Sequence, residues 1–384
     1  MHPPESGHGR SATVGRVHPA RIPRSADEQN RCVRLLVLGG SAFVGRSVVT
    51  AAIDRGWSVT TFNRGRNPWA HPQAQVLVGD RLEPADLTQL QGGCWDAVVD
   101  TWAGAPSAVL ESAAVLAECA GRYLYVSSRA VYTSPTPAGL DETHPTVAAS
   151  PNAADTDYAR NKRGGELAIE AVYGDRAVLA RAGLILGPHE DTGRLPNWLL
   201  RAARGGQLLA PGPADQPVQY IDVRDLAAWL LAATDSSVSG PVNLVTPAEH
   251  ATMADLLGAA VAAAGSDAEL IWVDPDAIQN TPIDRWTELP GWIPPGPEFA
   301  GLRSTNTDRA RSSGLRCRPV DQTVVDTWAW MTAAGSTAAA PPAALRLGLD
   351  PVKEQAALTE WRNRRHFVPR EPGWVAGPTE RRGP

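Results

Sequence analysis

A tyrosine and a lysine four residues apart form the pair of side chains with the clearest catalytic potential in this sequence. Tyr158-Ala159-Arg160-Asn161-Lys162 lies in a segment with helical periodicity, so the two side chains would share one helix face. A phenol with a pKa near ~10 is a poor acid or base at neutral pH, but an ammonium beside it favours the phenolate and lowers that pKa. The spacing therefore predicts a proton-transfer pair. The same residues also fit an exposed lysine beside a tyrosine that only packs.

Lysine is rare in this chain, which makes its position informative. Only Lys162 and Lys353 are lysines among the 36 basic residues, and the others are arginines, a bias typical of a GC-rich genome. A compact ammonium can reach a ribose hydroxyl where a branched guanidinium would fit less well. We therefore expect a chemical role for Lys162 and regard Lys353 as a solvated surface charge.

A glycine-rich turn lies between an apolar run and a helical pattern near the start of the chain. In a doubly wound α/β fold such a turn receives a dinucleotide pyrophosphate, which meets the free N–H groups of the helix N-terminus. Gly39 would permit the tight turn and Gly45 the close contact of helix and strand, while Ala42 replaces the usual middle glycine and weakens the expected binding. A plain structural turn is the alternative. The predicted cofactor contacts here are Gly39, Ser41, Ala42, Phe43, Val44 and Gly45.

The end of the second predicted strand should distinguish NADP from NAD. An NAD-preferring site usually has a carboxylate there, which holds the ribose 2′-hydroxyl. Asn63-Arg64-Gly65-Arg66 contains no acid, and its two guanidiniums suit a 2′-phosphate. We therefore expect NADP, with NAD as the alternative, and solvated surface charges would give the same pattern. Asp80, after the third predicted strand, is placed to meet the adenine or to serve in a turn.

The elements that must position these residues alternate between strand and helix. Short apolar runs predict strands at 33–38, 58–62, 75–78, 97–100, 123–126 and 177–180, and helical periodicity predicts helices at 44–55, 85–90, 108–120 and 157–172. This alternation is typical of βαβ units and of a parallel sheet covered on both faces. We predict an α/β fold, a Rossmann-type doubly wound parallel sheet with a smaller C-terminal substrate-binding region.

The pattern changes after Gly183. Helices are predicted at 195–204, 225–233, 253–264, 323–331 and 352–361, strands at 218–221 and 242–245, a Gly/Pro loop at 211–213, and irregular chain at 274–297. We divide the sequence into a disordered extension over 1–31, a dinucleotide-binding domain over 32–187, a substrate-binding region over 188–332 with returning Rossmann elements near 218–245, and a linker, short helix and disordered tail over 333–384.

Composition excludes several classes of function. A net charge of -5 gives no basic surface for nucleic acid, and no apolar run reaches the ~18 residues of a membrane span. The first 31 residues lack the apolar stretch of a secretory signal. The four cysteines show no CxxC spacing and the histidines no HExxH, so we expect no metal and a reducing cytoplasm.

Several motifs in the same order resemble the short-chain dehydrogenase/reductase superfamily, and within it the extended or atypical NAD-dependent epimerase/dehydratase family. The resemblance covers about 33–264. Beyond the glycine turn and the Tyr158/Lys162 pair, it rests on the segments 127–132 (Ser-Ser-Arg-Ala-Val-Tyr), 181–188 (Arg-Ala-Gly-Leu-Ile-Leu-Gly-Pro) and 220–227 (Tyr-Ile-Asp-Val-Arg-Asp-Leu-Ala).

The resemblance implies roles for individual residues. Tyr158 would be the general acid/base, Lys162 its partner and ribose ligand, and Ser128 rather than Ser127 the orienting hydroxyl, with hydride passing between C4 of the nicotinamide and a substrate carbon. Trp102 stands where many relatives have a small residue beside the cofactor. Four residues fall in the family's substrate-facing region, although packing is also expected for the last: His189, Arg194, Asn197 and Trp198.

Three functions fit these residues. The first is a cytoplasmic NAD(P)-dependent reductase or dehydrogenase acting on a hydroxyl or carbonyl carbon. The second is a nucleotide-sugar epimerase or dehydratase that retains a tightly bound NAD. The third is a dinucleotide-sensing or RNA-binding relative without turnover, which the intact Tyr158/Lys162 pair and the acidic charge disfavour. We expect a small-molecule substrate of moderately apolar character, no nucleic-acid or membrane partner, and a monomer or homodimer.

Overall fold

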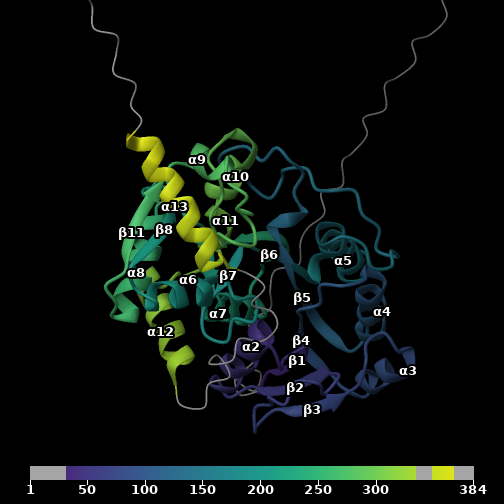
Figure 1. Ribbon diagram of the computed structural model, residues 1–384. Coiled ribbons are helices and arrows are strands. Elements are labelled where there is room, and N and C mark those ends of the chain that lie inside the picture. The colour runs from purple at the N-terminus through teal and green to yellow at the C-terminus, as the bar shows by residue number, and fades with distance from the viewer. Residues whose placement is uncertain (1–31, 334–347, 367–384) are drawn as a thin grey trace, which may run out of the picture. The chain divides into compact units, whose positions relative to one another are not determined.

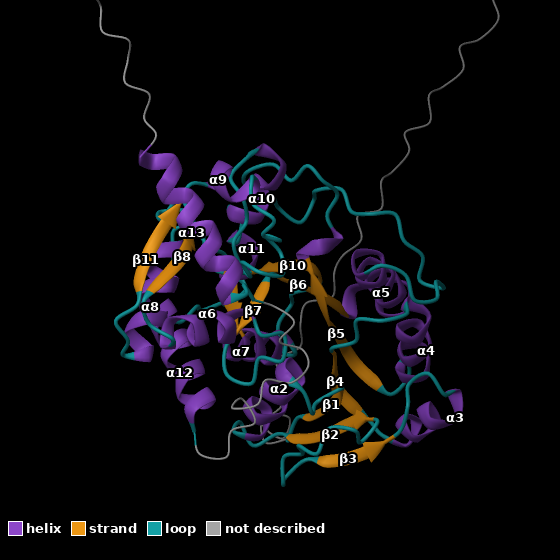
Figure 2. Cartoon of the chain, in the orientation of Figure 1, coloured by secondary structure: helices purple, strands orange, loops and turns teal. Residues whose placement is uncertain are grey.

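The computed structural model describes residues 32–333 and 348–366. Its main feature is a sheet of seven parallel strands (Figures 1 and 2). The strands lie in the order β10-β6-β5-β4-β1-β2-β3, so the winding direction reverses between β1 and β4. In open α/β sheets, ligands bind at such a reversal, beyond the carboxyl ends of the strands. The bounds are β1 Arg34–Leu38, β2 Ser58–Asn63, β3 Gln75–Val78, β4 Trp95–Asp100, β5 Ala120–Ser128, β6 Ala177–Ala182 and β10 Gly240–Leu244.

Helices cover both faces of this sheet (Figure 1). On one face α2 (Phe43–Ile53) packs against α7 (Val223–Ala233), and on the other α4 (Pro106–Leu116) packs against α5 (Tyr158–Tyr173). Burial on both faces explains the continuous apolar run of β1, whose residues Leu35–Leu38 are all buried. A short helix, α3 (Pro84–Leu87), and two 3-10 turns, η1 (Thr88–Gly92) and η2 (Arg129–Val131), complete this half.

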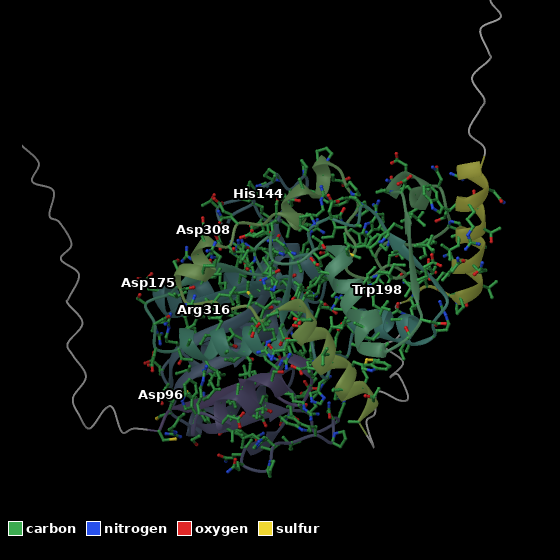
Figure 3. The ribbon with its side chains drawn as sticks, turned by 90° about the vertical axis from the view of Figure 1, so that its left-hand side faces the viewer. Asp96, His144, Asp175, Trp198, Asp308 and Arg316 are labelled. Carbon is green, nitrogen blue, oxygen red and sulfur yellow. The ribbon has the colours of Figure 1, made fainter. Side chains whose placement is uncertain are left out.

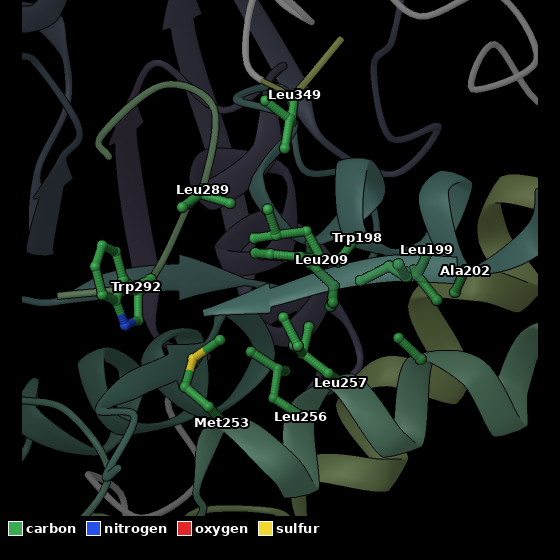
Figure 4. Close-up of a cluster of buried hydrophobic side chains, with 14 of the residues drawn as sticks. Trp198, Leu199, Ala202, Leu209, Met253, Leu256, Leu257, Leu289, Trp292 and Leu349 are labelled. Atoms are coloured by element: carbon green, nitrogen blue, oxygen red, sulfur yellow. The ribbon is translucent and has the colours of Figure 1, made fainter. Parts of the chain in front are cut away.

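The second half has its own core, formed around two small sheets. β7 (Leu184–Leu186) pairs with β9 (Tyr220–Asp222), and β8 (Gln207–Pro211) pairs with β11 (Glu269–Val273). Trp198, Leu209 and Leu257 belong to one buried apolar cluster (Figure 4). The helices are α6 Arg194–Ala203, α8 Met253–Ala264, α9 Pro275–Gln279, α10 Ala300–Arg303, α11 Asp308–Ser312, α12 Val320–Thr332 and α13 Pro351–His366, with a 3-10 turn at Pro297–Phe299. A further 3-10 turn, Gly174–Arg176, connects α5 to β6 in the first half.

The predicted doubly wound parallel sheet is confirmed, and the structure corrects several local expectations. The helix expected over 108–120 ends at Leu116, and Ala120 already belongs to β5. β8 ends at Pro211, at the start of the Gly/Pro loop expected at 211–213. The sequence did not predict β7, β8 or β11 as strands. α9 lies within the stretch that was expected to be irregular. These elements are only three to five residues long. A run that short carries little periodicity.

The described residues from Val33 onward form one compact unit by their contacts. β10, from the part of the chain where returning elements are expected, lies beside β6 in the main sheet. The expected extension over 1–31 and the linker and tail at 334–347 and 367–384 lie outside the described residues. Within the described ranges, no helix combines the length and apolar character needed to span a bilayer.

Candidate active site

The glycine turn brings the start of α2 close to the end of β1. Gly39 and Gly40 both have positive φ, 116° and 89°, a conformation that favours glycine. A Cβ at Gly45 would lie 2.7 Å from the Cα of Gly40, so the close contact expected of Gly45 is made with the turn itself. No side chain caps α2 at Ala42. The first N–H groups of the helix are therefore open to an anionic ligand.

A cavity of about 310 Å³ lies over this turn. The parallel register places Leu38 opposite Phe62 on one side and Asp100 on the other, which brings the carboxyl ends of β1, β2 and β4 together at the cavity. The lining residues are Leu38, Gly39, Gly40, Ser41, Ala42, Phe62, Asn63, Arg64, Arg66, Asn67, Gly79, Asp80, Arg81, Thr101, Trp102 and Ala103. The cavity thus lies at the reversal of strand order.

Six of the predicted cofactor contacts line this cavity and four do not. Gly39, Ser41, Ala42, Asn63, Arg64 and Asp80 form part of its wall. Phe43, Val44, Gly45 and Lys162 are not among the lining residues, and Phe43 is buried in the fold. Gly40, Asn67 and Arg81 were not among the predicted contacts, although the second consecutive glycine was a usable signal for Gly40.

The end of the cavity beside β2 carries positive charge. Arg64 and Arg66 are exposed there and make no ion pair with the described residues. Asn63 folds back, its Oδ1 accepting from the N–H of Gly65 at 2.9 Å, which shapes the turn that presents both guanidiniums. Asp80 accepts from the N–H of Leu82 at 3.1 Å, so it has its turn role while also lining the cavity.

Lys162 is buried and held between two backbone carbonyls. Its Nζ donates to the oxygen of Trp102 at 2.5 Å and to that of Val126 at 2.7 Å. Burial lowers the pKa of Lys162 to about 7, because the ammonium has lost most of its water. Nζ also lies 6.0 Å from the ring centre of Tyr158, whose side chain is 52% exposed. The buried ammonium thus lies behind an accessible phenol, as the four-residue spacing predicted.

A buried ion pair fixes the rotation of α5 against the sheet. Glu166 follows Lys162 by one helical turn and accepts from Nε and Nη2 of Arg181 in β6, at 2.8 and 2.9 Å. Ser127 of β5 also donates to Glu166 at 2.7 Å. α5 is therefore tied to two neighbouring strands at the level of its catalytic candidates.

The same contact separates the two serines at the end of β5. Ser127 is buried and engaged by Glu166. Ser128 is half-buried, and its Oγ accepts from the N–H of Ala130 at 3.1 Å, which leaves its own proton for another acceptor. This arrangement supports Ser128 as the candidate hydroxyl.

Trp102 does not fill the cavity, because its indole is folded back. Its Nε1 donates to the carbonyl of Ala105 at 3.1 Å, and its ring lies 4.9 Å from the guanidinium of Arg81. Arg81 in turn forms a buried pair with Asp100, which accepts from the N–H of Trp102 at 2.9 Å. This conformation places the Trp102 carbonyl at Lys162.

The predicted substrate residues have different positions. His189 has φ 68° and stacks edge-on with Trp330 at 5.1 Å, and burial lowers its pKa to about 4. Arg194 begins α6, and its Nη1 donates to Thr192 at 2.8 Å. Asn197 is half-buried against Gly348. Trp198, labelled in Figure 3, is 1% exposed and its Nε1 donates to the carbonyl of Pro290 at 2.6 Å, so it is a core residue, the packing role that the sequence also allowed.

Known proteins resemble the chain over these elements. The model of the "NAD dependent epimerase/dehydratase family" matches residues 35–245. UDP-glucuronic acid decarboxylase 1 of Xenopus tropicalis is 29% identical, over 71% of either chain. 2-Alkyl-3-oxoalkanoate reductase of Stenotrophomonas maltophilia is 26% identical, over 61% of this chain and 76% of the relative. The structure of Bordetella bronchiseptica WbmH in complex with NAD+ has a TM-score of 0.60 at 20% identity, covering 79% of this chain and all of that one.

Proposed function

The chain belongs to the NAD dependent epimerase/dehydratase family and is an enzyme of the extended short-chain dehydrogenase/reductase type, and from that premise we propose that it is a reductase or dehydrogenase acting at a hydroxyl or carbonyl carbon. The observation that carries the proposal is the position of the Trp102 carbonyl. Trp102 lines the cavity, and its oxygen receives the hydrogen bond of Lys162. The proton-transfer pair is thereby coupled to the cofactor cavity.

The residues of the cavity fit a nicotinamide adenine dinucleotide. The uncapped start of α2 and the two glycines with positive φ would hold the pyrophosphate, and the end of β2 would hold the adenosine ribose. When bound, this group supplies or accepts the hydride. The family model, NAD dependent by its description, supports such a cofactor.

The proton would move through Tyr158. In the direction of reduction, its hydroxyl gives a proton to the substrate oxygen, and the ammonium of Lys162 stabilises the phenolate left behind. Ser128 would orient the same oxygen with its free O–H. Because the Tyr158 side chain is half exposed, a substrate can reach it without opening the fold.

NADP is the cofactor that the charges favour. Two exposed guanidiniums at the end of β2 face the cavity, and no carboxylate stands in the Asn63–Asn67 segment. A 2′-phosphate would accept charge-assisted hydrogen bonds from them. NAD remains the alternative, since the structure of WbmH was determined with NAD+.

A nucleotide-sugar epimerase is the second candidate. The structure of UDP-glucose 4-epimerase from Thermotoga maritima with UDP-glucose has a TM-score of 0.59 at 16% identity, which shows a shared fold. The reductase is preferred because the Stenotrophomonas relative is by name the reductase of a ketone. An epimerase of this kind would be purified with its nucleotide, so denatured protein should release NAD if this candidate is right.

A measurement of nucleotide binding distinguishes the reductase and the epimerase from a protein that binds no cofactor. The melting temperature of the full chain, purified free of nucleotide, should rise by several °C with NADP+ at about 100-fold over its Kd, and less with NAD+. NADPH oxidation with a panel of aldehydes and ketones then tests turnover. A larger shift with NAD+ would contradict the NADP assignment, and no shift with either nucleotide would contradict the proposed function.

A further inference from the structure

Tyr125 is a buried phenol whose hydroxyl reaches the chain just beyond the neighbouring strand. It lies in β5 and its side chain is fully buried. The parallel register pairs Tyr125 with Asp100, the last residue of β4, so its side chain lies beside the loop that follows this strand. There its Oη donates to the carbonyl oxygen of Trp102 at 3.0 Å. Burial raises the pKa of Tyr125 well above its usual range, so the phenol keeps the proton that it donates.

The same carbonyl oxygen accepts a hydrogen bond from Lys162. A carbonyl oxygen has two lone pairs, and among the described residues Tyr125 and Lys162 are the two donors to this one. The bond from Nζ of Lys162 measures 2.5 Å. Nζ also lies 4.8 Å from the centre of the Tyr125 ring, whose face attracts a cation. Tyr125 therefore contacts the ammonium through its ring and contacts an acceptor of the ammonium through its hydroxyl.

The two acceptors of Lys162 are held in place by different means. The Val126 carbonyl, 2.7 Å from Nζ, belongs to β5, which pairs with β4 on one side and β6 on the other. Trp102 lies two residues beyond the end of β4, where the strand pairing has ended. The orientation of its carbonyl therefore depends on hydrogen bonds from side chains, and Tyr125 supplies one of them.

Glycine at position 165 makes room for the hydroxyl. Gly165 lies in α5, three residues after Lys162 and on the same side of the helix. A Cβ there would lie 2.6 Å from Oη of Tyr125 and 2.8 Å from its Cζ. A side chain at this position would therefore push the phenol away from its place beside Lys162.

We propose that Tyr125 is a positioning residue of the active site: its hydroxyl holds the Trp102 carbonyl, and this carbonyl holds the ammonium of Lys162 close to Tyr158. The proposal rests on the proposed function, in which the ammonium stabilises the phenolate of Tyr158, and it adds the residue that fixes the lysine. Without the hydroxyl, the carbonyl is free to turn away, and a buried ammonium cannot replace it readily with water. The charged form of Lys162 then becomes less stable.

Tyr125→Phe isolates this effect, because it keeps the ring beside Nζ and removes only the hydroxyl. It also leaves in place the other titratable groups around the lysine, which are Tyr158, Asp100, Arg81 and Glu166. Tyr173→Phe is the matched control. It removes another buried tyrosine hydroxyl, which has no hydrogen-bond partner among the described residues.

The presence of only two lysines makes the measurement direct. In the full chain labelled with carbon-13 at lysine Cε, NMR gives one signal each for Lys162 and Lys353, and Lys353→Arg identifies them. The Lys162 signal should titrate near pH 7 in wild type and about 0.5–1 pH unit lower in Tyr125→Phe, as expected when a hydrogen bond to a charged group is partly lost. In Tyr173→Phe it should titrate as in wild type. The pH above which the rate of NADPH oxidation falls should move together with the Lys162 signal.

Two results would overturn the assignment: Lys162 titrates equally in wild type and Tyr125→Phe, or Tyr173→Phe shifts it by the same amount. If Tyr125→Phe does not fold, Gly165→Ala displaces the same hydroxyl by steric contact and should also lower the pKa of Lys162. An unchanged titration in that variant would count equally against the role of Tyr125. The melting shift of wild type with NADP+, measured first, reports the proposed function separately. An intact NADP+ shift with an unchanged Lys162 titration contradicts only the role of Tyr125.

Discussion

The ammonium of Lys162 donates a 2.5 Å hydrogen bond to the carbonyl oxygen of Trp102. This bond joins two parts of the site that are 60 residues apart in the chain. Trp102 lines the cavity, and the ammonium belongs to the helix that begins with Tyr158. The bond therefore links the helix of Tyr158 and Lys162 to a residue of the cavity wall.

The lysine should make stability depend on pH. Its pKa of about 7 in the folded protein lies below the value in the unfolded chain, so above pH 7 the unfolded state binds a proton that the folded state lacks. Raising the pH from 7 to 9 should therefore stabilise wild type relative to Lys162→Met, by up to about 1.4 kcal/mol per pH unit. Urea unfolding of both proteins at each pH measures the difference. A gap that stays constant with pH would contradict the lowered pKa.

Glu166 should be essential for the stability of α5. Glu166→Gln leaves the buried guanidinium of Arg181 without its counter-ion, which should cost about 3–5 kcal/mol of unfolding free energy. Glu170→Gln is the matched control on the same helix, because Glu170 is 38% exposed and its ion pair with Arg163 is worth less than about 1 kcal/mol. Denaturant titration of the two variants should separate them clearly. Equal losses would mean that the buried pair does not anchor the helix.

The glycine turn should tolerate no side chain at position 45. Gly45→Ala places a methyl group against the backbone of Gly40 and should abolish nucleotide-induced stabilisation, since the turn must move. Gly258→Ala, inside α8 with open space around it, should raise stability by about 0.5–1 kcal/mol and leave nucleotide binding intact. Thermal melts with and without NADP+ report both effects. A Gly45→Ala protein that still responds to NADP+ would argue against this turn as the pyrophosphate site.

Arg64 should contribute to cofactor preference. Arg64→Ser removes one charge-assisted contact with the 2′-phosphate, worth about 1.5–3 kcal/mol, so the Kd for NADP+ should rise roughly 10- to 100-fold while that for NAD+ changes little. Arg316→Ser serves as an exposed control away from the cavity. Calorimetric titration of wild type and both variants with each nucleotide gives the dissociation constants to be compared. If the two nucleotides lose affinity equally, Arg64 does not distinguish them.

The main sheet and the closeness of Tyr158 and Lys162 on one helix could be predicted because their signals are local. β1 is an apolar run that ends at a glycine, and Tyr158 and Lys162 share a helix face by spacing alone. The ion pair of Arg81 with Asp100 could not be predicted in the same way, because the sequence around either residue does not indicate which residue it contacts in the folded chain. Arg129 looked like one more arginine in an arginine-rich sequence. Its distinction, that its hydrogen-bond acceptors among the described residues are all neutral, exists only once the chain is folded.

The central claim is that Tyr158 transfers the proton, and one substitution with a matched control tests it. Tyr158→Phe removes the hydroxyl at the start of α5. Tyr173→Phe removes a buried hydroxyl at the end of the same helix, which has no hydrogen-bond partner among the described residues. The rate of NADPH oxidation with the best carbonyl compound of a panel should fall at least about 100-fold in Tyr158→Phe, as expected for loss of a general acid. It should stay near wild type in Tyr173→Phe. An unchanged rate in Tyr158→Phe would contradict the claim.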